Sequence, residues 1–132
     1  MAVKMSNYLA TEVLKAIMKG ENMSYSALYV SLHTAEPDNT GSGEVVAGGN
    51  TYHRKQLAST DWTIPIDGSV ESAIDLLWVN MPAVTVTHIG LWDVVDGGNF
   101  LWSGLLNEPV ISSAGDAFIL NTGDIKVEID PV

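Results

Sequence analysis

The sequence of 132 residues contains no cysteine. This excludes a disulfide framework, a thiol nucleophile and a thiolate metal site, because each of them needs a cysteine sulfur. The N-terminal stretch also lacks the continuous apolar core of a signal peptide and the length of a membrane span. We therefore expect a protein that is made and kept in the cytoplasm until it assembles.

Basic residues are scarce as well. Six lysines and arginines stand against sixteen acidic residues, which gives a net charge of −10, and residues 56–125 contain no basic residue at all. Binding to nucleic acid depends largely on lysine and arginine neutralising phosphates, and attraction to an anionic membrane surface depends on the same residues. We therefore expect no nucleic-acid partner and no membrane partner.

Motifs of enzyme active sites are missing too. The sequence has no G-x-S-x-G elbow, no phosphate-binding glycine loop, no H-E-x-x-H and no dinucleotide fingerprint. His33, His53 and His88 fall on separate predicted strands, where surface or interface histidines are favoured over a shared metal. Asp93 and Asp96 flank the central turn, where two carboxylates would mimic a glycosidase pair, but aspartate at a hairpin end is ordinary turn chemistry and the turn is favoured. We expect no enzymatic activity, no cofactor and no metal.

The residues that are present predict one packed domain spanning residues 1–132, because 46% of them are apolar and only 17% charged. Residues 6–19 predict an amphipathic helix, begun by Ser6 or Asn7 and ended by Gly20. We expect it to cover the sheet, with a helix that binds a partner as the alternative. Its apolar stripe comprises Met5, Leu9, Val13 and Ile17, widened by Leu14 and Met18.

Residues 84–106 predict the central hairpin of the fold. Two runs rich in β-branched and aromatic residues flank the turn at residues 96–99. Strict alternation places apolar side chains on both faces of each run, so we expect the hairpin to be covered on both sides. The cover is another sheet, a helix or a neighbouring subunit, and cover from its own chain alone is equally open.

Shorter strands are expected around this hairpin, separated by glycine and aspartate turns. Residues 70–79 fit a helix loosely, but the neighbouring strands favour a strand there too. The fold class is therefore predicted as all-β, an antiparallel, jelly-roll-like β-sandwich over residues 27–130 with one N-terminal helix. The remaining strands are expected at residues 27–34, 51–58, 62–66, 110–113, 117–121 and 125–130.

Residues 35–50 form a long polar connection and a candidate binding loop. Its carboxylates Glu36, Asp38 and Glu44 suit calcium chemically, but their spacing matches no calcium loop, and a solvated acidic loop is favoured.

The tryptophans suggest two further roles. Exposed indole rings stack on sugars, whereas buried ones fill cores or anchor subunit interfaces, and we favour the latter. Trp92 and Trp102 lie on facing arms of the central hairpin, where an aromatic pair would stabilise the sheet. The candidate interface residues are Trp92, Trp102, His88, Phe100, Tyr52 and Arg54.

A series of short motifs runs through nearly the whole chain. They are S-N-Y-L (6–9), L-Y-V-S-L-H-T-A-E-P (28–37), E-V-V-A-G-G-N-T-Y-H-R (44–54), G-S-V-E-S (68–72), V-T-H-I-G-L-W-D (86–93), L-W-S-G-L-L (101–106), A-G-D (114–116) and G-D-I (123–125). In their order the chain resembles the small structural proteins of tailed bacteriophages described as tail-fibre or minor tail proteins. The resemblance implies a non-enzymatic virion component, made in the host cytoplasm, that assembles with copies of itself and with other virion proteins.

The sequence shows no fibrous repeat and no shaft, so we expect a compact adaptor or tip on the tail or baseplate, as a homotrimer. Two alternatives are a cement protein that decorates the capsid and a lectin-like module that binds a host surface glycan. The sequence does not separate tail from capsid attachment.

Overall fold

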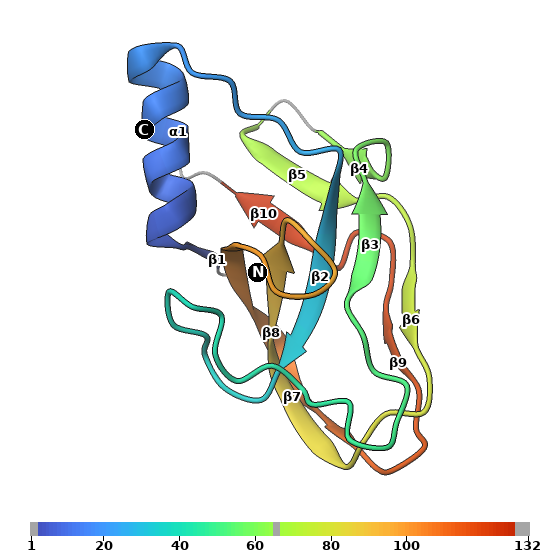
Figure 1. Cartoon of the computed structure of the whole chain (residues 1–132). Helices are drawn as coiled ribbons and strands as arrows, with labels where there is room; N and C mark the ends of the chain where they lie inside the picture. The colour runs from blue at the N-terminus through green and yellow to red at the C-terminus, as the bar shows by residue number, and fades with distance from the viewer. Residues whose placement is uncertain (1–2, 65–66, 129–132) are drawn as a thin grey trace.

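The computed structural model describes residues 3–64 and 67–128 (Figure 1). The chain folds mostly into antiparallel β-sheet, and the predicted N-terminal helix is present. The elements are β1 (Val3–Met5), α1 (Asn7–Lys19), β2 (Ala27–His33), β3 (Lys55–Ala58), β4 (Trp62–Thr63), β5 (Ser69–Ser72), β6 (Leu76–Trp78), β7 (Val84–Trp92), β8 (Phe100–Ser112), β9 (Phe118–Leu120) and β10 (Lys126–Glu128).

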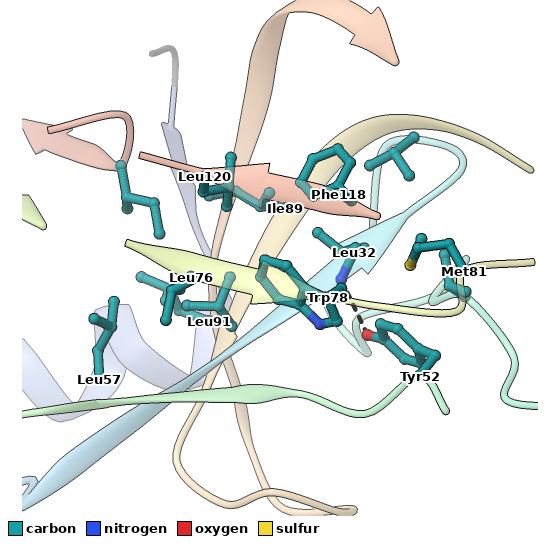
Figure 2. Packing of buried hydrophobic residues seen from close by; sticks show 14 of the residues in the cluster. Leu32, Tyr52, Leu57, Leu76, Trp78, Met81, Ile89, Leu91, Phe118 and Leu120 are labelled. Atoms are coloured by element: carbon teal, nitrogen blue, oxygen red, sulfur yellow. Dashed lines mark hydrogen bonds between the residues drawn. The ribbon is translucent and has the colours of Figure 1, made fainter. Parts of the chain in front are cut away.

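The described strands form three sheets. The largest has the order β1-β8-β7-β2-β3, the second β10-β5-β4, and β6 pairs with β9 alone. The central core packs side chains of the large sheet against those of the two smaller ones, and Figure 2 shows the rings of Trp78, Phe118 and Tyr52 within it. This arrangement is a layered antiparallel fold, and a jelly-roll strand order stays a prediction.

Polar atoms in this core have partners. The Trp78 ring, 1% exposed, packs edge-on against Phe118 and donates from Nε1 to the carbonyl of His53 at 2.8 Å. The Tyr52 hydroxyl accepts from the Leu32 amide at 3.0 Å and donates to Glu44 Oε2 at 2.7 Å. A buried donor left unpaired costs about 1–3 kcal/mol, so these bonds fix how the rings lie.

Helix α1 begins and ends at the expected signals. Ser6 caps it by accepting from the Leu9 amide at 3.1 Å, and Gly20 ends it in the left-handed conformation at φ 67°. Within α1, all of whose residues are described, only Leu9 is buried. Figure 1 shows the helix standing beside the sheets, joined to them through β1 at its N-terminal end. The expectation that it covers the sheet is wrong for its C-terminal half.

The central hairpin is formed by β7 and β8, and its connection spans residues 93–99. The connection is longer than the expected four-residue turn because Asp93 ties its two ends together, accepting from the Asn99 amide at 2.8 Å and from the Asn99 side chain at 2.9 Å. Val94 and Val95 consequently lie exposed in the connection, and the expectation that they continue the strand is wrong.

Two shifts in register change which faces the hairpin side chains occupy. Between Val86 and His88 the pairing on β8 moves from Val110 to Leu105, which leaves residues 106–109 opposite Thr87. Strict alternation would put Val86 and Ile89 on opposite faces, but both lie in the central core. The extra β8 residues include a proline, which the interrupted ladder tolerates.

Other strands differ from the prediction in extent. Residues 70–79 are extended as expected, but they form two strands, β5 and β6, in different sheets. Asp75 lies between these two strands. Its carboxylate accepts a hydrogen bond from the Thr122 amide at 2.7 Å. The strand predicted at residues 110–113 is the end of β8. Of the strand predicted at residues 51–58, only residues 55–58 form β3. Residues 65–66 and 129–130 of the predicted strands lie outside the described residues.

We expect Gly90→Ala to lower the free energy of unfolding by about 1–3 kcal/mol, the usual cost of overpacking. A Cβ on Gly90 would lie 2.5 Å from Ser31 Oγ and 2.7 Å from His33 Nε2. Gly48→Ala is the matched control, because a Cβ there has no neighbour within 4 Å. Urea denaturation of both variants measures the difference, and equal stabilities would contradict the packing described for β7.

Candidate assembly surface

Four of the six candidate interface residues lie inside the subunit. Trp92, Phe100, Tyr52 and Arg54 are each 5–8% exposed. Trp92 packs edge-on against Phe100 with ring centroids 5.1 Å apart. The predicted pairing of Trp92 with Trp102 is wrong, because the register shift after Leu91 places Phe100 opposite Trp92. The second face of the hairpin is therefore covered by its own chain.

Arg54 holds this cover in place, in an arrangement we call the Arg54 clip. Its guanidinium donates to both carboxylate oxygens of Glu44, from Nε at 3.1 Å and from Nη2 at 2.9 Å. Nη1 donates to the carbonyls of Val94 at 3.1 Å and Gly97 at 2.8 Å. The guanidinium carbon lies 3.7 Å from the centroid of the Trp92 ring. The clip thus joins residues 35–50 and 93–99 to the sheet through charge-assisted bonds.

A chain of hydrogen bonds lies under the clip. Trp92 Nε1 donates to Ser31 Oγ at 2.8 Å, and Ser31 Oγ lies 2.6 Å from His33 Nε2. His33 Nδ1 lies 2.8 Å from the carbonyl of Ser42, which only accepts, so Nδ1 carries the proton and Nε2 accepts from Ser31. Burial lowers the pKa of His33, so the ring is held neutral.

The carboxylates of the candidate binding loop point to three different partners. Glu36 pairs with Lys4, Asp38 accepts from Thr40 at 2.8 Å, and Glu44 belongs to the Arg54 clip. Among residues 3–64 and 67–128, no three potential metal ligands lie together. Sequence reasoning placed Glu44 and Arg54 in separate sites, whereas the structure brings them into contact.

The last two candidate interface residues are half-buried. His88 pairs with His33 on the neighbouring strand β2, and its Nδ1 is 2.8 Å from Thr87 Oγ1.

Trp102 lines an open groove of about 680 Å³ between the large sheet and the β10-β5-β4 sheet, which we call the apolar groove. No pattern in the sequence indicates that these segments meet. The groove is lined by Tyr25, Ala27, Leu28, Leu57, Ser59, Trp62, Ile64, Gly68, Ser69, Val70, Leu91, Trp102 and Val127.

A second apolar surface lies on the C-terminal half of α1. Leu14, Ile17 and Met18 are 56%, 68% and 75% exposed, and we call them the α1 stripe. Their spacing was visible in the sequence, but their exposure was not. No helix in the described part of the chain is long and apolar enough to cross a membrane.

A protein-family model described as podophage GP4 fiber I protein gp80 matches residues 4–128. The chain belongs to this family. It is therefore a phage tail fibre protein, a structural component of the virion, which fits a non-enzymatic role. No curated protein matches the chain.

We expect Glu44→Gln to destabilise the protein by about 3–5 kcal/mol, because it leaves the buried Arg54 charge without its ion pair. Glu36→Gln is the matched control: its pair with Lys4 is exposed, so a change within about 1 kcal/mol is expected. Thermal and urea unfolding measure both, and similar losses would contradict a special role for the clip.

Stability should also fall in mild acid. Burial lowers the pKa of His33 below 6.5 in the folded state. Below pH 6.5 the His33 ring is therefore protonated in the unfolded chain but still neutral in the folded chain. The free energy of unfolding then falls as pH drops below about 6.5, by at most about 1.4 kcal/mol per pH unit. Urea titrations from pH 7 to 5 should show a weaker slope for His33→Gln than for the exposed control His53→Gln; equal slopes would refute the assignment.

Proposed function

We propose that the protein is a compact adaptor or tip unit of a phage tail fibre, and that it assembles with copies of itself and with other fibre proteins. The observation that carries this proposal is the pair of uncovered apolar surfaces, the α1 stripe and the apolar groove. Large exposed apolar surfaces typically mark interaction sites. Membership of a fibre family supports assembly as the purpose of these surfaces.

The expected homotrimer is part of this proposal. Most homo-oligomers have closed cyclic symmetry, and permanent assemblies bury on the order of 2,000 Å² or more. The outer edge of β8 is a weaker candidate for the contact, although Val110 and Ile111 are exposed there. Glu108 and Pro109 interrupt that edge, and charge and proline are devices that prevent strand pairing.

Binding of a host glycan is the second candidate, because Trp62 and Trp102 both line the open groove. Sugars are held by aromatic rings together with several well-placed polar groups, whereas the groove offers only the hydroxyls of Tyr25, Ser59 and Ser69 among mainly apolar side chains. The groove therefore suits protein side chains better. Capsid decoration, the remaining alternative, has no support from a fibre family.

Size-exclusion chromatography with light scattering should give a mass near three copies of the 14.1 kDa chain at micromolar concentration. A monomer across the accessible concentration range would contradict self-assembly. Binding to a glycan array that Trp62→Ala abolishes, with the fold intact, would favour the glycan candidate instead.

A further inference from the structure

We propose that neighbouring copies are joined by the α1 stripe of one copy docking into the apolar groove of the next. This inference rests on the proposed self-assembly and specifies the contact. Leu14, Ile17 and Met18 are spaced i, i+3 and i+4, so they form one face of the helix. A helix that lays such a face into a hydrophobic groove is a recurrent mode of protein recognition.

Within the described part of the chain, the helix does not bury this face. Its attachment to the sheets lies at the opposite end, where Leu9 is buried and the Ser6 amide donates to the carbonyl of Leu101 at 2.8 Å. The α1 stripe therefore projects from the body, as Figure 1 shows for the helix. A second copy that covers the stripe removes its apolar side chains from water without disturbing this attachment.

Charge favours a second copy as the occupant of the groove. Residues 6–20 carry two lysines against one glutamate, whereas the remaining chain carries four basic and fifteen acidic residues. Lys15 and Lys19 would thus approach an acidic body. Asp61 and Asp67 directly precede the groove residues Trp62 and Gly68 in the chain, so they add acidic charge next to the groove.

The stripe and the groove are different patches, so the contact is head-to-tail. Such a contact forms a ring if the rotation closes and a filament if it does not. A closed ring of three copies satisfies every stripe and every groove with a single kind of interface. Each copy then donates one helix and accepts one.

Three exposed isoleucines allow the same substitution at the stripe, at the groove and elsewhere. Ile17, Ile64 and Ile111 are 68%, 76% and 81% exposed, so Ile→Asp should leave each subunit folded. We expect Ile17→Asp and Ile64→Asp each to weaken self-association at least tenfold in light scattering, and Ile111→Asp to behave as wild type. Circular dichroism checks the fold. An oligomeric wild type with unchanged Ile17→Asp and Ile64→Asp variants would overturn this contact but not self-assembly.

Disulfide trapping identifies the pairing, since the chain has no cysteine of its own. A mixture of Ile17→Cys and Ile64→Cys chains should form mixed disulfide dimers under mild oxidation, well above the yield from either variant alone. Dimers from Ile17→Cys alone would indicate helix-to-helix contact and overturn the proposal. A wild type that is monomeric would instead overturn the proposed self-assembly itself.

Discussion

The architecture depends on the contacts of one buried charged group, the guanidinium of Arg54. A charge this far inside the protein is tolerated only when it is paired and fully hydrogen-bonded. Glu44 and two carbonyls of the hairpin connection satisfy it, while the Trp92 ring covers its face. Because these partners come from distant segments, one side chain holds the long loop and the hairpin connection against the sheet.

This internal cover decides which apolar surfaces remain available for the proposed assembly. The central hairpin has two apolar faces, but the core covers one and the clipped loop covers the other. Apolar surface remains on the α1 stripe and in the apolar groove. In the proposed assembly, the hairpin with Trp92 and Phe100 is covered within the subunit, and separate elements contact the partners.

Much of the fold could be predicted from sequence. The helix signals at Ser6 and Gly20 and the strand composition of β7 and β8 are local, so they appear directly in the residues. The candidate site was harder to predict. Trp92 and Arg54 were expected at an interface because aromatic residues and arginine are common there, yet the same residue types also build interiors.

The sequence by itself determined the helix, the strand-rich composition, the acidic charge and the lack of enzyme motifs, because these depend on residues close together in the chain. Only the tertiary structure decided which apolar side chains are covered. Burial depends on contacts such as that of Glu44 with Arg54 and on the register shift beside Thr87, which moves side chains from one face to the other. Neither is encoded in a local pattern.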